Sequence, residues 1–248
     1  MFGISETKFT NKVRNNSLKI NGFKFYRKNH SSKNGDGLLA YVRESIDVQR
    51  RTDLESNDLE CIALEVLLKK SKPFFVCHMY RHPSSKVDWK DKFEAFVDSL
   101  YNEDREIIIL GDINRDLLNR SINTEWIDFI SSLSLEQLVN EPTRVSKNTS
   151  TLIDHIYSSE PLNISNVIVP HMGISDHFPV FMTRKINSNL KNNSHETISF
   201  RNFSSFKEND FCSDLAKINW GCLNTYETVD TCLEFWQETF LNTVDKHL

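Results

Sequence analysis

The sequence has little that would mark a metal-thiolate or disulfide-stabilised protein. Its 248 residues include five cysteines, Cys61, Cys77, Cys212, Cys222 and Cys232, an odd number without a Cys-x-x-Cys pair. That pattern argues against a zinc site and against a disulfide framework. Cys61 and Cys77 fall inside apolar runs, which is typical of small core residues.

The sequence also lacks a secretory signal and an apolar run that could span a membrane, which bears on the expected cellular compartment. The stretch at 1–6 has no basic region followed by an apolar one, so it does not resemble a secretory signal. No apolar run approaches the length that a membrane span needs. The Asn-x-Ser/Thr triplets are therefore expected to be unmodified. We expect the protein in a reducing compartment, the nucleus or the cytoplasm.

A strong charge of one sign is also missing. The formal net charge is −4, so the composition as a whole does not indicate a polyanion as partner. A local basic patch together with metal ions is nevertheless sufficient for a nuclease. Hydrophobic residues make up 39% of the chain, with 17 Phe. That is enough for a sizeable core, in one large domain or in a domain with a tail.

The most informative stretch is 106–114, which reads Glu-Ile-Ile-Ile-Leu-Gly-Asp-Ile-Asn. Four consecutive apolar residues, three of them β-branched, favour a strand that is buried on both faces. Asp112 and Asn114 follow directly after Gly111. Loops at the ends of buried strands are where α/β folds collect their chemistry, although Gly-Asp-x-Asn is also compatible with an ordinary turn.

Apolar periodicity predicts the other elements of the main domain. Amphipathic helices are expected over about 88–104, with Asp88 among the candidate caps, and over about 123–134, with Asn123 as cap. Residues 1–8 are expected to be the end of a strand with Glu6 at its tip, and further strands are expected at 23–27, 38–43, 59–68, 74–80, 106–110, 152–157, 164–169 and 177–183.

Composition divides the chain into a main domain at 1–184, a polar linker at 185–203 and a helical tail at 204–248. Within the tail, Ser205-x-x-Glu208 is typical of a capping box before a short helix. A longer helix is expected over about 227–246. Its apolar stripe needs a packing partner, either the main domain or another protein.

Polar side chains gather at the predicted strand ends. Asp154 lies inside an apolar run, where a carboxylate is costly unless it is paired or bound to a metal. Asp176 and His177 are expected to open the last strand. The set offers hard oxygen ligands, an amide, a phenol and a histidine, which suits Mg²⁺ or Mn²⁺ and the hydrolysis of phosphate esters. Its members are Glu6, Tyr80, Asp112, Asn114, Asp154, Asp176 and His177.

Each of these residues also has a simpler interpretation. Glu6 is compatible with a solvated surface acid, and Tyr80 with an ordinary strand residue. Asp154 is compatible with a helix cap or a salt bridge. Asp176 and His177 are compatible with a turn beside a hydrogen-bonded histidine. The remaining histidines singled out, His30, His78, His82, His155 and His171, are expected to be structural or at the surface.

Five segments, in this order, resemble motifs of the endonuclease/exonuclease/phosphatase family, which includes apurinic endonucleases, deoxyribonuclease I and inositol polyphosphate phosphatases. They are Ile4-Ser5-Glu6-Thr7-Lys8, Met79-Tyr80-Arg81-His82-Pro83-Ser84-Ser85, Gly111-Asp112-Ile113-Asn114, Thr151-Leu152-Ile153-Asp154-His155-Ile156 and Ser175-Asp176-His177-Phe178-Pro179-Val180. Ser-Glu-Thr, residues 37–43, the Tyr-Arg-x-Pro-Ser-Ser segment and Thr143-Arg144 further resemble endonuclease domains of LINE-type, jockey-like retrotransposons. The resemblance covers about residues 1–184.

The resemblance implies an α/β fold, a four-layer αββα sandwich of two mixed β-sheets with helices outside, followed by the C-terminal helical tail. Relatives begin with a further strand that carries an asparagine, and the resemblance implies that this first strand is missing here. The implied activity is that of a divalent-metal-dependent phosphodiesterase, a DNA endonuclease that nicks one strand and leaves a 3′-hydroxyl for retrotransposition. Two alternatives stay open: a truncated, non-catalytic remnant of such a domain, and a phosphatase for a small phosphorylated substrate.

The resemblance also implies partners and a metal. Glu6 is the expected main ligand of Mg²⁺ or Mn²⁺, and Asp176 the expected acid of a second metal site or water shell. DNA is the expected substrate and no membrane is involved. The tail at 204–248 resembles the spacer before a reverse transcriptase domain, which a full-length element carries and this chain does not.

Five residues receive catalytic roles from the resemblance. Asp112 is expected to orient or deprotonate the attacking water, and Asn114 to hold the scissile phosphate. His177, oriented by Asp154, is expected to stabilise the phosphorane-like transition state. Tyr80 is expected to touch the phosphate.

Overall fold

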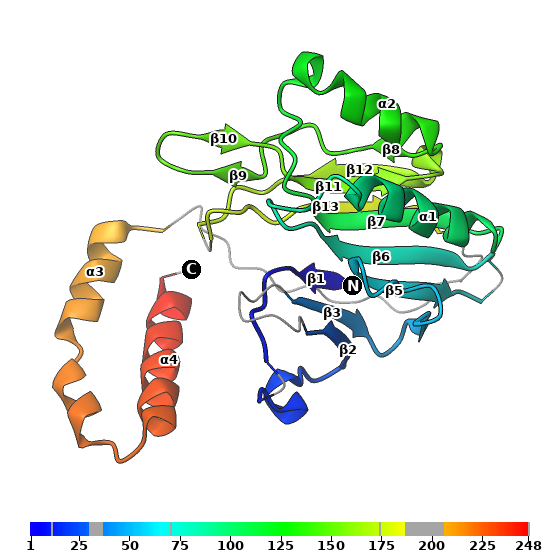
Figure 1. The fold of residues 1–248 in the computed structure, drawn as a ribbon. Coiled ribbons are helices and arrows are strands. Elements are labelled where there is room, and N and C mark those ends of the chain that lie inside the picture. Colours follow the sequence, from blue (N-terminus) through cyan, green and yellow to red (C-terminus); the bar gives the residue numbers. More distant parts are fainter. Residues whose placement is uncertain (11, 30–36, 70, 174, 187–205, 248) are drawn as a thin grey trace. The chain divides into compact units, whose positions relative to one another are not determined.

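The chain forms two compact units, residues 1–189 and 190–248. Figure 1 shows their helices and strands. The computed structural model describes residues 1–10, 12–29, 37–69, 71–173, 175–186 and 206–247. His30 and most of the predicted linker at 185–203 lie outside these residues. In the described part of the chain, no helix has the length and apolar character needed to cross a membrane.

A six-stranded mixed sheet, in the order β4-β5-β6-β7-β11-β8, forms the centre of the first unit. β7 runs parallel to β6 on one side and antiparallel to β11 on the other. Ile107, Ile108 and Ile109 are fully buried, so the prediction of a strand covered on both faces is confirmed. The strands are β4 (Asp47–Arg50), β5 (Glu60–Leu67), β6 (Phe74–Tyr80), β7 (Glu106–Asp112), β8 (Glu136–Gln137) and β11 (Asp154–Ser158).

A three-stranded antiparallel sheet packs against β5 and β6 of this sheet. Alternate residues of its central strand divide between two sides, as the period of a strand requires. Leu38, Ala40 and Val42 join the main core, whereas Leu39 and Tyr41 form a smaller cluster on the outer face. The strands are β1 (Phe2–Ile4), β2 (Phe23–Lys28) and β3 (Leu38–Arg43), in the order β1-β3-β2.

Two helices, α1 (Trp89–Tyr101) and α2 (Thr124–Ser132), cover β11 from the same side (Figure 1). The Phe93 ring of α1 lies 6.3 Å from the ring of Tyr157, and Trp126 Nε1 of α2 donates to the Tyr157 hydroxyl at 3.0 Å. The two helices contact each other through stacked Trp89 and Trp126 rings, with centroids 5.9 Å apart. Both predicted helices are therefore confirmed, and the first unit has the predicted α/β fold with two main sheets.

The predicted cap positions of these helices are confirmed, but their side chains do not cap the helices. Asp88 and Asn123 occupy the N-cap positions, but neither side chain accepts a hydrogen bond from its helix. The Asp88 carboxylate instead pairs with Lys92 at 2.9 Å. Asn123 Oδ1 accepts a bond from Arg115 Nε at 3.1 Å. In both cases a cation within reach competes with the backbone N–H groups for the side-chain oxygen.

The last strand begins later than predicted. β13 (Phe181–Arg184) pairs with β12 (Ile164–Ile168), and Pro179 has no N–H with which to extend that ladder backwards. His177 instead forms an isolated bridge with Arg144, the first residue of β9 (Arg144–Val145), which pairs with β10 (Ser150–Thr151). The expectation that Asp176 and His177 open the last strand is therefore wrong.

The second unit is helical, as predicted for the tail. It contains α3 (Glu208–Lys217), a 3-10 turn at Trp220–Thr225 and α4 (Val229–Lys246). The predicted capping box is misplaced, because Lys207 is the N-cap of α3 and Ser205 lies outside the described residues. Lys246 Nζ donates to Asp214 Oδ2 at 2.6 Å and so joins the two helices.

Candidate active site

Three of the predicted site residues meet at one end of the six-stranded sheet. Asp112 is the last residue of β7 and Asp154 is the first of β11, and the antiparallel register places the two directly opposite each other. His177 approaches from the segment between β12 and β13. One ligand atom from each of the three residues lies within 4.8 Å of the others. We refer to this group as the Asp112–Asp154–His177 cluster.

Asp154 orients the imidazole of the cluster. Its Oδ2 lies 3.0 Å from His177 Nδ1. This hydrogen bond raises the pKa of His177, because the neighbouring carboxylate favours the charged ring. A carboxylate on Nδ1 fixes the ring orientation and leaves Nε2 for a substrate or a solvent molecule.

Asp112 is the most perturbed acid of the cluster. Its side chain is buried, and burial raises the pKa of Asp112 to about 7, with further repulsion from Asp154. The Asn114 N–H donates to Asp112 Oδ1 at 2.9 Å and opposes part of that shift. A carboxyl group with a pKa near neutrality is suited to exchange protons at physiological pH.

The donor set of the cluster fits a divalent cation. Two carboxylates and an imidazole converge, and the carboxylates repel each other without a cation. Oxygen-rich sites of this kind suit Mg²⁺ or Mn²⁺, and a bound cation would stabilise the charged form of Asp112.

Glu6 and Tyr80 form a second group beside the cluster. The Tyr80 hydroxyl, at the end of β6, donates to Glu6 Oε1 at 2.7 Å. Glu6 has φ of +53°, a region that side chains other than those of Asn and Asp rarely occupy. Its charge contributes to the raised pKa of Asp112. Glu6 is therefore within electrostatic reach of the cluster, although it supplies none of the cluster's converging ligand atoms.

Asn114 ties the ends of β6 and β7 together. Its Nδ2 donates to the Arg81 carbonyl at 2.9 Å, and the Arg81 N–H donates to the Asp112 carbonyl at 2.9 Å. Asn114 has φ of +50°, which asparagine tolerates better than most residues. One amide hydrogen is committed to Arg81, and the other has no partner among the described residues.

Asp176 lies outside the cluster. Its Oδ2 accepts a bond from Arg144 Nε at 2.9 Å, and this ion pair lowers the pKa of Asp176. Its charge also contributes to the raised pKa of His177. The predicted acid of a second metal site is thus already paired with Arg144.

Two buried residues that were not predicted as site residues, Thr143 and His155, support the cluster. Thr143 Oγ1 accepts bonds from the backbone N–H of Asp154 at 3.0 Å and of Ile153 at 3.2 Å. Burial lowers the pKa of His155 to about 4, so its ring is neutral at physiological pH. Its Nε2 donates to the Arg115 carbonyl at 2.9 Å, which holds the loop after β7. For His155 the available signal was a polar residue inside an apolar run, whereas Thr143 lies in a polar stretch that gave no such signal.

Comparison with known proteins identifies the family. The model of the endonuclease/exonuclease/phosphatase family matches residues 2–177. Among curated protein sequences, no relative matches the chain. Solved structures give matches of low identity, which carry information about the fold alone.

The three matched structures described next have TM-scores above one half. The endonuclease domain of TRAS1, a telomere-specific non-LTR retrotransposon, has a TM-score of 0.56 at 13% identity, over 68% of this chain and 83% of that chain. The Xenopus laevis APE2 catalytic domain has a TM-score of 0.54 at 15% identity, over 75% and 84%. An AP endonuclease from Archaeoglobus fulgidus has a TM-score of 0.52 at 13% identity, over 74% and 88%. With a family match that spans nearly all of the first unit, the chain belongs to the endonuclease/exonuclease/phosphatase family.

Proposed function

We propose that the protein is a divalent-metal-dependent phosphodiesterase that nicks one strand of DNA and leaves a 3′-hydroxyl. The observation that carries this proposal is the Asp112–Asp154–His177 cluster, in which a proton-exchanging carboxyl faces a carboxylate-oriented imidazole. The family comprises nucleases and phosphatases, and the similarity to the TRAS1 endonuclease domain supports DNA as the substrate. In a full-length element the 3′-hydroxyl would serve a reverse transcriptase.

The role of each cluster residue follows from its burial and its hydrogen bonds. Asp112, with its pKa near neutrality, accepts the proton of the attacking water. His177, held by Asp154 and charged more readily than an isolated histidine, stabilises negative charge on the phosphoryl oxygens. Asn114 uses its remaining amide hydrogen to hold the scissile phosphate.

Glu6 and Tyr80 are expected to act on the metal ion and the phosphate. Glu6 is the residue we expect to hold Mg²⁺ or Mn²⁺, which would neutralise phosphate charge. Tyr80, hydrogen-bonded to Glu6, positions that carboxylate and contacts the phosphate. Asp176 acts through its charge on His177 and as a candidate for a second metal site.

Conversion of supercoiled plasmid to open circle, with Mg²⁺ and with EDTA, tests the proposal. We expect nicking that EDTA abolishes and that Asp112→Ala or His177→Ala lowers by at least ~10²-fold, the scale of losing one acid–base or electrostatic contributor. Asp98→Asn, an exposed charge on α1, serves as the matched control and should nick like the parent.

Three outcomes would contradict parts of the proposal. If His177→Ala nicks like the parent, its assigned role is wrong. If the folded protein does not nick DNA with either metal ion, the non-catalytic alternative is favoured. If it releases phosphate from inositol phosphates and leaves plasmid intact, the protein is a phosphatase.

A further inference from the structure

Glu6, the expected metal ligand, is not fixed in place by packing. Its side chain is 44% exposed, and Lys8 Nζ lies 4.0 Å from its carboxylate. The Tyr80 hydroxyl donates to the same carboxylate. The backbone of Glu6 has φ of +53°, a strained conformation that persists only where the surrounding structure enforces it. The chain on either side of Glu6 therefore needs anchors.

His78 supplies the anchor before Glu6. It lies two residues before Tyr80 in β6, so the two side chains point to the same face of the strand. A hydrogen bond of 3.1 Å joins His78 Nε2 to Ser5 Oγ, while the Tyr80 hydroxyl contacts Glu6. Two consecutive residues after β1 are thus held by two alternate residues of β6.

The His78 ring is enclosed between β1 and β6. It is 5% exposed, and a Cβ added at Gly3 of β1 would lie 2.8 Å from its Cε1 and its Nδ1. Nδ1 is buried and has no hydrogen-bond partner in the part of the chain that the structure describes. Burial lowers the pKa of His78 to about 4, so the ring is neutral at physiological pH. It therefore holds Ser5 through a hydrogen bond and not through charge.

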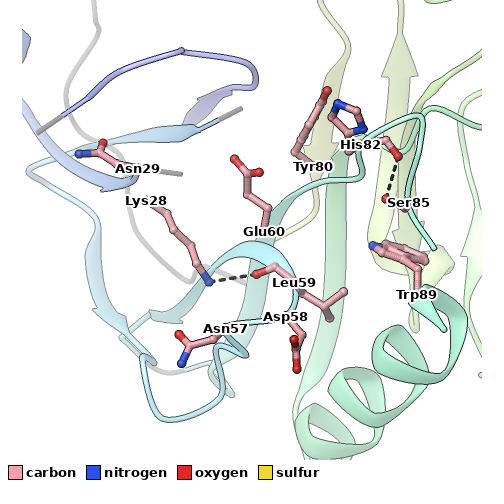
Figure 2. Close-up of a pocket in the computed structure, with 10 residues that line it drawn as sticks. All are labelled: Lys28, Asn29, Asn57, Asp58, Leu59, Glu60, Tyr80, His82, Ser85 and Trp89. Atoms are coloured by element: carbon pink, nitrogen blue, oxygen red, sulfur yellow. Dashed lines mark hydrogen bonds between the residues drawn. The ribbon is translucent and has the colours of Figure 1, made fainter. Parts of the chain in front are cut away.

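A second anchor follows Glu6. The Thr7 N–H donates to the Gly37 carbonyl at 3.1 Å, and the Gly37 N–H donates to the Glu60 carboxylate. Glu60 of β5 lies directly opposite Tyr80 of β6, and Figure 2 shows both side chains on the same side of the sheet. Both main-sheet strands therefore contribute to holding the strained segment.

We propose that His78 is a positioning residue for Glu6. Through Ser5 it fixes the backbone that precedes Glu6, and Tyr80 then sets the direction of the carboxylate. Without this hydrogen bond the segment occupies further conformations, and only the fraction with Glu6 correctly placed binds a metal ion tightly, which raises the apparent dissociation constant. The inference rests on the proposed function, in which Glu6 holds Mg²⁺ or Mn²⁺.

Matched variants separate the hydrogen bond from packing. His78→Met keeps a side chain of similar size without the hydrogen bond, whereas His78→Gln places an amide near the position of Nε2. Ser5→Ala removes only the hydroxyl of a half-buried residue, so this variant should fold even if a substitution of the buried ring does not. Asp98→Asn, an exposed change on α1, is the control.

The affinity for Mn²⁺ is measured on the full chain without DNA, by electron paramagnetic resonance of the free ion. His78→Met and Ser5→Ala should each raise the dissociation constant of Mn²⁺ roughly 3- to 10-fold, the scale of one hydrogen bond. His78→Gln and Asp98→Asn should keep the affinity of the parent. The double variant of Ser5→Ala and His78→Met should lose no more than either single one, because both remove the same interaction.

Amide hydrogen exchange of the ¹⁵N-labelled chain in EDTA tests the anchor without a metal ion. Exchange of the Thr7 N–H should be faster in His78→Met and in Ser5→Ala than in the parent and in His78→Gln, because the segment opens locally more often. The Arg81 N–H, which donates to the Asp112 carbonyl, should exchange at the parent's rate in all of them.

The outcomes distinguish this inference from the proposed function. An unchanged Mn²⁺ affinity or an unchanged Thr7 exchange in both His78→Met and Ser5→Ala would overturn it, even if plasmid is nicked. Equal losses in His78→Gln and His78→Met would assign the ring to packing and would also overturn it. A parent that binds no Mn²⁺ would refute the proposed function, and the Thr7 exchange rates would then decide whether His78 anchors the segment.

Discussion

Replacement of Gly111 by alanine is expected to disrupt the junction on which the candidate site depends. Gly111 lies one residue before Asp112 in β7 and has φ of +141°. A Cβ added there would lie 1.9 Å from the carbonyl oxygen of Met79 and 3.0 Å from its carbonyl carbon. Because the clashing atoms belong to the backbone of β6, no side-chain rotation relieves the contact.

The expected loss of stability has two parts. Alanine in a backbone region that L-residues rarely adopt costs about 1–2 kcal/mol. Separation of β6 from β7 also strains the hydrogen bond from the Arg81 N–H to the Asp112 carbonyl, which is 2.9 Å long, and a buried backbone group that loses its partner costs about 1–3 kcal/mol. Together these give roughly 2–5 kcal/mol, a large fraction of the free energy of unfolding of a typical domain.

Urea unfolding of Gly111→Ala and Gly22→Ala measures this difference. Gly22 also has a positive φ, +79°, but an added Cβ there meets nothing within 4 Å. Gly22→Ala should therefore lose only the backbone part, about 1–2 kcal/mol, and should keep nicking activity. Equal losses of stability in the two variants would refute the close approach of Gly111 to β6.

Three further predictions concern the metal, the pH and the two units. Mg²⁺ at a hundred times its dissociation constant should stabilise the folded protein by about 2.7 kcal/mol, because a ligand of the folded state shifts the equilibrium. Glu6→Gln should lose this shift in thermal melts, and an equal shift in that variant would contradict the assigned metal ligand. Burial lowers the pKa of His78 and of His155 to about 4, below the unfolded value of about 6.5, so the unfolded state binds more protons between these values. The contribution of these two histidines to the free energy of unfolding is therefore complete above pH ~6.5 and should be lost as the pH decreases to ~4. The complete loss is roughly 3 kcal/mol per histidine. Urea midpoints that stay constant over this range would refute the burial of both rings. A chain that ends at residue 189 should keep the urea midpoint of the first unit, measured by near-ultraviolet circular dichroism, and a lower midpoint would show that the second unit supports the first.

Local sequence patterns were sufficient where the physical cause is itself local. A run of β-branched residues at 106–110 indicated a strand buried on both faces, and the structure buries Ile107, Ile108 and Ile109 completely. The apolar spacing of α1 and α2 indicated both helices for the same reason, since one face of each has to be covered. Their N-cap residues were predicted, but the partners of the side chains were not: Asp88 forms an ion pair with Lys92, and Asn123 accepts a hydrogen bond from Arg115.

The polar residues available for chemistry can be identified from the order of amino acids, but which of them meet depends on how distant segments pack. Asp112 and Asp154 face each other because β7 and β11 pair in one particular antiparallel register. Asp176, adjacent to His177 in sequence, is instead paired with Arg144. A side-chain period shows which face a residue takes, but the choice of partner strand and register comes from the packing of segments far apart in the chain.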